Sequence, residues 1–305
     1  MSLHDYNPPI GKIIKLSDDV RLVVAPNASY MTCKGTQTYI IGRGKEVALI
    51  DPGPINEFHL EALNYALEKK KIIGIFITHS HTDHSPLGKI ISKRYDIPVY
   101  GFGTSGSGKS KIMEKLSQVK NIGGEEGIDK KFKPDINLSS NDFVSSNDWI
   151  LEAIHTPGHM SNHLCFSLND GEVLFTGDLV MGWSTTLISP PDGDVGQYKE
   201  SLAILLKRKE QLYYPGHGAP IFDGKALVQE HLSHRKQREQ EILSAMSEHG
   251  STISAIVEKV YPDLSDTLKV AASRNVFAHL IHFFENDLIS INTVDPSLKS
   301  LFFSR

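Results

Sequence analysis

The 305-residue chain has few cysteines, no excess of basic charge and no apolar run long enough to cross a membrane. Cys33 and Cys165 stand far apart in no CxxC spacing, so we expect two ordinary buried thiols and no disulfide, as in a reducing compartment. The formal net charge of −4 excludes a global attraction to nucleic acid or to an anionic membrane. Residues 1–9 lack the basic and apolar regions of a secretory signal, and we expect a cytoplasmic protein.

Short apolar runs separated by Gly, Pro, Asn and Asp fill residues 20–214 and are typical of a mixed α/β pattern. A helix is expected over residues 57–70. A second should begin at Ser85 and Pro86, since serine can cap a helix and proline loses no hydrogen bond at its first position. Residues 169–172 predict a hairpin turn. We expect strands at residues 38–41, 47–50, 72–77, 97–100, 150–154, 164–168, 173–175 and 212–214.

The pattern changes after about residue 221, where helices are expected at 225–248, 252–260 and 268–286, followed by short β-like pieces. We therefore predict a catalytic domain over residues 1–222 and a small winged-helix-like domain over residues 223–305. Residues 225–305 hold nine Lys and Arg against ten Asp and Glu, which argues against DNA binding. Packing on the first domain, or formation of a homodimer, is the expected role.

Residues 78–84 read Thr-His-Ser-His-Thr-Asp-His and follow a wholly apolar strand. Such residues are costly to bury unless they are paired or bind a metal, and loops after strands often carry sites. Side chains two positions apart in an extended segment point the same way, so His79 and His81 can hold one ion. Asp83 and His84 can then face a neighbouring ion. Imidazole and carboxylate ligands suit zinc, iron or manganese.

Three more polar residues follow expected strands: His159 in His-Thr-Pro-Gly-His, Asp178 in Thr-Gly-Asp and His217 in Pro-Gly-His-Gly. Glycine lets the backbone turn sharply there and present one side chain. The HxHxDH, PGH, GD and PGHG motifs, in this order over about residues 20–222, resemble the metallo-β-lactamase-fold superfamily. The resemblance implies an α+β fold, an αββα sandwich followed here by the helical winged-helix-like domain.

The resemblance also implies a binuclear metal-dependent hydrolase with two divalent ions, zinc first and iron or manganese as alternatives. A hydroxide bridging the ions would attack a carbonyl or phosphorus, and Asp83 would also orient the attacking water. Asp51 is expected to orient a ligand histidine, and His163 either to reach the substrate or to pack in the core. The implied ligands are His79, His81 and His159 for one ion, Asp83, His84 and His217 for the other, and Asp178 as the bridge.

Residues 35–42, 50–53 and 234–239 are similar to the β-lactamase-like protein 2 family, which includes endoribonucleases that act on single-stranded RNA. This similarity implies a single-stranded RNA endoribonuclease. A hydrolase of small esters or thioesters, of the glyoxalase II kind, stays open because the same hydroxide serves either substrate. The alternative from another class is a non-catalytic module that binds nucleotides or nucleic acid.

Residues 103–110 match the phosphate-binding pattern GxxxxGK[ST] letter for letter. No apolar strand ending in aspartate is free to complete a nucleotide site, so we interpret the segment as a flexible loop at the active-site rim. Lys109 and Lys111 could touch a substrate phosphate there. Arg235 and Arg238, three positions apart on an expected helix, predict an intramolecular ion-pair patch or an RNA-backbone contact.

Overall fold

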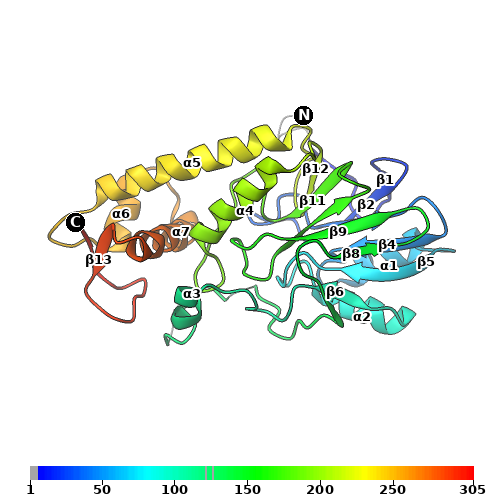
Figure 1. Cartoon of the computed structure of the whole chain (residues 1–305), viewed down its shortest axis with the longest axis horizontal. Helices are drawn as coiled ribbons and strands as arrows, with labels where there is room; N and C mark the ends of the chain where they lie inside the picture. The colour runs from blue at the N-terminus through cyan, green and yellow to red at the C-terminus, as the bar shows by residue number, and fades with distance from the viewer. Residues whose placement is uncertain (1–5, 121, 126) are drawn as a thin grey trace.

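Two β-sheets lie face to face between helices (Figure 1) in the computed structural model, which describes residues 6–120, 122–125 and 127–305. Helices α1 (Glu57–Ala66) and α2 (Pro86–Tyr95) pack on the outer face of one sheet. Helices α4 (Val195–Lys207) and α5 (Gly224–Ala245) pack on the outer face of the other. The predicted αββα sandwich is confirmed. The expectation about a secretory signal rests partly on residues 1–5, which lie outside the described residues.

The first sheet has the strand order β1-β2-β3-β4-β5-β6-β7. Strands β4 to β7 run parallel to one another, so their carboxyl ends lie at the same edge of the sheet, where sites form in open α/β sheets. The strands are β1 (Ile14–Lys15), β2 (Val20–Val24), β3 (Gln37–Ile41), β4 (Glu46–Ile50), β5 (Lys71–Phe76), β6 (Val99–Gly101) and β7 (Ile136–Asn137).

The second sheet has the order β12-β11-β10-β9-β8 and is antiparallel except for its parallel pair β11 and β12. Asn169 and Asp170 take left-handed φ angles of 47° and 56° in the predicted turn between β10 and β11. All eight predicted strands are found, each within two residues at either end. The strands of this sheet are β8 (Phe143–Ser145), β9 (Ile150–His155), β10 (Leu164–Leu168), β11 (Val173–Gly177) and β12 (Tyr213–Pro215).

Successive side chains along a strand pack into different layers of the sandwich. In β3, Tyr39 and Ile41 pack between the two sheets, whereas Ile40 packs against α1 and α2. In β10, Phe166 packs between the sheets and Cys165 packs under α4. Because both faces of each sheet are covered, the central strands are largely apolar, as the sequence pattern indicated.

Several helix ends differ from the predictions. Helix α1 ends at Ala66, four residues before its predicted end, where the chain turns through Lys69 at a φ of 63°. Ser85 does not cap α2, because its own backbone is already helical and its hydroxyl lies 3.2 Å from the carbonyl of His81. Helices α3 (Lys111–Leu116) and α4 were not predicted, although Asp194 caps α4 by accepting a hydrogen bond of 2.8 Å from the Gly196 amide.

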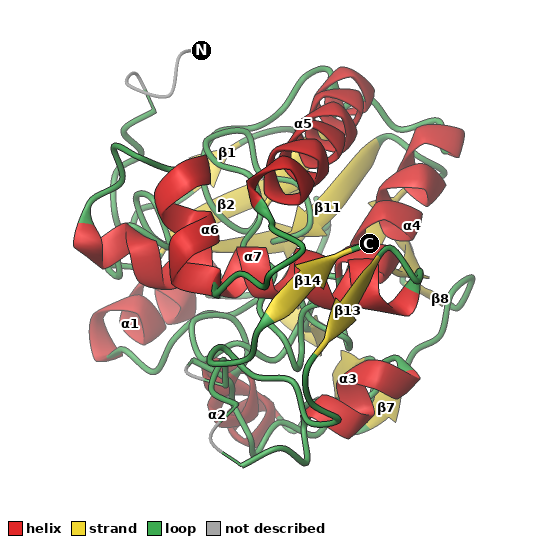
Figure 2. Cartoon of the chain, turned by 90° about the vertical axis from the view of Figure 1, so that its left-hand side faces the viewer, coloured by secondary structure: helices red, strands yellow, loops and turns green. Residues whose placement is uncertain are grey.

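The C-terminal part contains α6 (Ile253–Val260), α7 (Asp266–Glu285) and an antiparallel ribbon of β13 (Ile289–Ile291) and β14 (Phe302–Ser304), and it is a winged-helix arrangement (Figure 2). Helix α5 joins the two parts: Val228 packs in the sandwich, and Ile242 and Ala245 pack against α6 and α7. The expected packing on the first domain is therefore found. The boundary after residue 222 stays a prediction.

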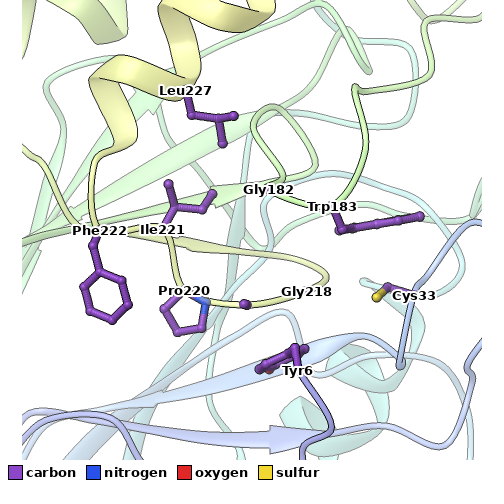
Figure 3. Close-up of a pocket in the computed structure, with 10 residues that line it drawn as sticks. Tyr6, Cys33, Gly182, Trp183, Gly218, Pro220, Ile221, Phe222 and Leu227 are labelled. Carbon is purple, nitrogen blue, oxygen red and sulfur yellow. The ribbon is translucent and has the colours of Figure 1, made fainter. Parts of the chain in front are cut away.

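The two cysteines are free, and only one of them is buried. Cys165 lies in the core, whereas Cys33 is half-buried, which corrects the expectation of two buried thiols. Cys33 lines a cavity of about 270 Å³ together with Tyr6 and Trp183 (Figure 3). Cys33 lies in the loop between β2 and β3, close to the exposed residues Tyr30 and Met31.

Candidate metal centre

All seven predicted ligands come from strand ends at one edge of the sandwich. Four of them follow β5 in a single loop, and the others follow β9, β11 and β12. They form two groups in which the possible ligand atoms lie within 4.8 Å of one another: His79, His81, His159 and Asp178 in the first, and Asp83, His84 and His217 in the second. The parallel pairing of β11 with β12 explains why Asp178 and His217 meet.

The first group brings three imidazole nitrogens together. His81 Nδ1 lies 3.0 Å from His79 Nε2 and 3.1 Å from His159 Nε2. Asp178 Oδ2 lies 3.9 Å and 3.7 Å from the same Nε2 atoms of His79 and His159. Donor atoms that bind one tetrahedral zinc ion at about 2.0–2.1 Å lie about 3.3–3.4 Å apart. The spacing therefore fits a single ion.

The second group has the same spacing. The Nε2 atoms of His84 and His217 are 3.3 Å apart, and Asp83 Oδ2 lies 3.4 Å and 3.2 Å from them. Asp178 Oδ1 lies 3.5 Å from His84 Nε2, and its Oδ2 lies 3.4 Å from His217 Nε2. The Asp178 carboxylate thus stands between the two groups, in a position to bridge two ions.

Asp51, at the end of β4, contacts the loop that holds both groups. Its Oδ2 accepts hydrogen bonds from His84 Nδ1 at 2.9 Å and from the Thr78 hydroxyl at 2.6 Å, and its Oδ1 accepts one from the Thr78 amide. The Thr78 oxygen in turn lies 2.9 Å from His79 Nδ1. One buried carboxylate therefore orients a histidine of each group. Its backbone φ of 49° is rare for a non-glycine residue and is the kind of strain found at functional sites.

Backbone carbonyls orient the other two histidines that present Nε2. His159 Nδ1 lies 2.8 Å from the carbonyl of Leu187, and His217 Nδ1 lies 3.3 Å from that of Gly35. An acceptor at Nδ1 keeps the proton there and leaves the Nε2 lone pair free for an ion. In the first group, the imidazole nitrogens of His79, His81 and His159 face one another. Without a proton between them their lone pairs repel each other, so a cation is a fitting partner for all three.

The electrostatics of the centre also fit a cation. Burial, followed by neighbouring imidazoles, lowers the pKa of His81 to about 3 and holds that of His79 far below its usual value. Burial also opposes a proton on His217, but Asp178 and Asp83 outweigh it and raise the pKa of His217 to about 9. These shifts favour neutral imidazoles in the first group and a positive charge beside the carboxylates of the second, which a divalent cation can supply in place of a proton.

Two other residues from the sequence analysis lie outside the ligand groups. His163 is fully buried, with Nδ1 3.0 Å from the Thr156 hydroxyl, and does not line the cleft over the metal centre. Lys109 forms an ion pair of 3.2 Å with Asp192, which does line the cleft. Ser110 also donates a hydrogen bond of 2.7 Å to Asp194. The 103–110 loop lies at the rim of the cleft as expected, but these contacts hold it in a fixed position.

Sequence reasoning missed the residues that hold the His217 loop. The side chain of Gln37 donates to the Gly218 carbonyl, and the Tyr39 hydroxyl donates to that of Pro215. A Cβ atom on Gly216 would stand 2.4 Å from Asp178 Oδ1, so only glycine fits between the two ligand loops. The sequence did show this glycine, in the Pro-Gly-His-Gly motif. The resemblance at residues 35–42 includes Gln37 and Tyr39 but did not indicate this role, because their contacts lie far away in the sequence.

A cleft of about 710 Å³ lies over the metal centre. The sandwich contributes ligands to its lining, and the winged-helix part contributes Val270, Ala271, Arg274 and Leu298. Arg274 fixes α7 there: its guanidinium donates to the carbonyls of Ile122 and Gly123 and to the Ser189 hydroxyl. The C-terminal domain thus walls the cleft.

Comparison with known proteins agrees with this geometry. Residues 31–217 match the model of the metallo-beta-lactamase superfamily, and residues 252–290 match that of the beta-lactamase associated winged helix domain. The chain belongs to the metallo-β-lactamase superfamily, and it is a metal-dependent hydrolase with a winged-helix domain.

The chain is similar to several individual proteins. The chain is 30% identical to a beta-lactamase-like protein 2 homolog of Drosophila melanogaster over 89% of each chain. It is 31% identical to an atrochrysone carboxyl ACP thioesterase of Aspergillus chevalieri, over 83% of this chain and 77% of the relative. A beta-lactamase domain protein from Burkholderia ambifaria shares the fold with a TM-score of 0.79 and 17% identity, covering 99% of this chain and 96% of that one.

No helix among the described residues is long and apolar enough to span a membrane.

Proposed function

We propose that the protein hydrolyses acyl thioesters with two divalent ions, zinc first and iron or manganese as alternatives. The observation that carries this proposal is the lining of the cleft over the metal centre. Apart from the ligands, the cleft is lined chiefly by apolar side chains and glycines, including Met31, Leu187, Val270, Ala271 and Leu298. Such a lining suits an acyl chain, whose burial is favourable.

The charges around this cleft do not suit an RNA strand. Arg274 is the only Lys or Arg among its described lining residues, and its guanidinium donates to protein oxygens. Asp192 adds a negative charge that Lys109 already pairs. RNA binding relies on several phosphate contacts along the strand, and a cleft with one engaged cation provides few.

The residues present can support thioester hydrolysis. Divalent ions held by the two groups would supply a Lewis acid that polarises the acyl carbonyl and lowers the pKa of a bound water. Asp83 lines the cleft, and 25% of its side chain is accessible. It is more exposed than the carboxylates of Asp51 and Asp178. The Thr36 hydroxyl donates to Asp83 Oδ2 at 3.3 Å and orients it. Asp83 can accept a proton from the attacking water and pass it to the sulfur as the carbon–sulfur bond breaks.

Single-stranded RNA is the second candidate, and a groove beside α2 favours it. Lys89, Lys93, Lys131 and Lys133 line a groove of about 690 Å³ that also includes Ser85, the residue after the ligand His84. Asp129 and Asp135 lie in the same groove and reduce its positive potential. We therefore rank RNA cleavage below thioester hydrolysis.

A paired assay separates the two candidates. Metal-loaded protein is given a neutral hexanoyl thioester of N-acetylcysteamine and an unstructured RNA across a series of salt concentrations. We expect thioester turnover that chelation abolishes and that salt leaves nearly unchanged, since no phosphate contacts release counterions. A Lys93→Gln/Lys131→Gln variant, which changes only the groove, should keep this turnover. RNA cleavage that falls steeply with salt and is lost in that variant, without thioester turnover, would reverse the ranking.

A further inference from the structure

A second cavity opens on the same metal centre from the side of the helical domain. It has a volume of about 270 Å³ and shares His159 and Asp178 with the main cleft. Its other walls come from α5 and α7, which lie side by side (Figure 2), from the segment that joins α6 to α7, and from the loops around Met31 and Trp183. One end of the cavity therefore touches the reacting centre, and the other lies among helices.

Four nitrogen atoms of this cavity's lining residues are buried without a hydrogen-bond partner within the described part of the chain. They are Trp183 Nε1, His234 Nδ1, Arg235 Nε and Arg238 Nε. All four can donate a proton to an acceptor. Buried polar groups in native proteins are rarely unpaired, so a cluster of them in one cavity favours a ligand that offers hydrogen-bond acceptors.

Arg235 carries a buried positive charge whose described contacts are all neutral. The residue is 2% exposed, and its guanidinium donates to the Thr186 carbonyl and, at 3.4 Å, to Asn275 Oδ1. It also lies 5.2 Å from the centre of the Tyr198 ring. Among the described residues no carboxylate forms an ion pair with it, which corrects the expected ion-pair patch at this position. A buried charge without a counterion is costly, so an anion is the fitting ligand.

Arg238 is held in place beside Arg235. Its Nη1 pairs with Glu241 at 2.7 Å, as the expected patch required, and its guanidinium lies 4.2 Å from the centre of the Tyr261 ring. These contacts fix both guanidinium planes and leave the Nε–H groups unused. A site whose donors are already fixed loses little entropy when it binds an oxyanion.

We propose that Trp183, His234, Arg235 and Arg238 bind one anionic group of the substrate, a carboxylate or phosphate oxyanion, while the scissile thioester lies at the metal centre. The inference rests on the proposed function and names a substrate class within it. The apolar residues Met181, Leu264 and Leu268, which line the same cavity, would contact the carbon chain between the two ends. One localised anion site also differs from the row of cations that a nucleic acid needs.

Matched thioesters test the site and distinguish the source of the anion. Glutaryl-N-acetylcysteamine is compared with its methyl ester, which has no charge on the acyl group. Butyryl-phosphopantetheine is compared with butyryl-pantetheine, which has no phosphate on the thiol. We expect the charged member of one pair to have a KM lower by about 10-fold or more, since hydrogen bonds to charged groups have that strength. Equal KM values within both pairs overturn the proposal.

Variants assign the effect to the site. Arg238→Gln should reduce the preference for the anionic substrate by about 10-fold, and Trp183→Phe, which keeps a ring but loses its N–H, by about threefold. Both should act mainly through KM. Lys236→Gln removes an exposed charge from the same helix outside the cavity and should leave the preference intact. An equal loss in Lys236→Gln, or unchanged preference in Arg238→Gln, contradicts the assignment.

Calorimetry with glutarate and with inorganic phosphate separates this proposal from the proposed function. If no thioester is hydrolysed but either anion binds wild type and Lys236→Gln and not Arg238→Gln, the anion site stands and thioester hydrolysis fails. If thioesters are hydrolysed but neither anion binds in an Arg238-dependent way, the site fails and the hydrolase stands.

Discussion

The sandwich and the winged-helix part contribute to one cleft in different ways. The sandwich supplies all seven candidate metal ligands, from the ends of β5, β9, β11 and β12. The helical part supplies no ligand to these groups, but it supplies cleft walls such as Val270 and Ala271 and the cations Arg235 and Arg238. Strand ends therefore position the candidate ligands, whereas we propose that substrate selection depends on how the helices dock.

The largest effect should come from the carboxylate between the two ligand groups. Asp178→Ala should lower thioester turnover by about 10³-fold or more and reduce the bound metal, because Asp178 approaches histidines of both groups. Metal analysis and steady-state rates check this. Asp192→Asn, in the same cleft but outside both groups, should keep its metal. Full metal content in Asp178→Ala would contradict the two-group assignment.

A smaller effect is expected at Asp51, which contacts a candidate ligand and is not itself one. Asp51→Asn keeps the size of the side chain but weakens its contacts with His84 and Thr78, so metal affinity should fall by about 10- to 100-fold. Competition with a chelator of known affinity measures the change. Turnover at saturating metal should recover largely, which a ligand variant would not do. An unchanged affinity would contradict the role of Asp51 in orienting the ligand histidines.

The junction between the two regions should show a modest pH effect. Burial, and then the nearby Arg235, lowers the pKa of His231 to about 4, and its Nδ1 lies 3.3 Å from the Tyr198 hydroxyl across the α4–α5 contact. Because the folded pKa is depressed, the unfolded chain takes up the proton first as the pH falls below about 6.5. Between pH 6.5 and 5.5 the wild type should therefore lose about 1 kcal/mol more stability than His231→Gln.

Urea unfolding of both proteins at the two pH values, with chelator present, measures this difference. The chelator removes the contribution of metal release, and the ligand histidines titrate alike in both proteins. Equal losses would mean that the folded structure does not lower the pKa of His231.

The smallest effect is expected at the loop that resembles a phosphate-binding motif. Lys109 is paired with Asp192, and Ser110 donates to Asp194, so neither is free for a nucleotide. Calorimetry with ATP and magnesium should detect no binding, and Lys109→Ala should keep its metal. Micromolar ATP affinity that disappears in Lys109→Ala would overturn this interpretation.

Much of the sandwich could be predicted because apolar strands leave local signals. Glycine and a single His or Asp after three strands marked His159, Asp178 and His217 as candidate ligands, whereas their assignment to two ions came from the resemblance to the metallo-β-lactamase fold. Helix α4 also has a local signal, its cap at Asp194, which the sequence analysis overlooked.

The walls of the cleft could not be predicted, because they depend on contacts between distant segments. Arg274 reaches the carbonyls of Ile122 and Gly123, about 150 positions earlier, and nothing near Arg274 in the sequence announces this. Likewise, Arg235 matches an ion-pair pattern by spacing, but burial under the loop at Thr186 gives it neutral partners. Helical spacing predicts neighbours on one helix and does not predict what docks on them.

The central claim, that strand-end ligands bind metal ions which the reaction requires, has one direct test. Chelated protein is titrated with zinc while bound metal and hydrolysis of the neutral hexanoyl thioester are measured in the same samples. The account predicts negligible turnover without metal and a rise in rate that follows occupancy up to two ions per chain. Full turnover in metal-free protein, or bound zinc without any effect on the rate, would contradict it.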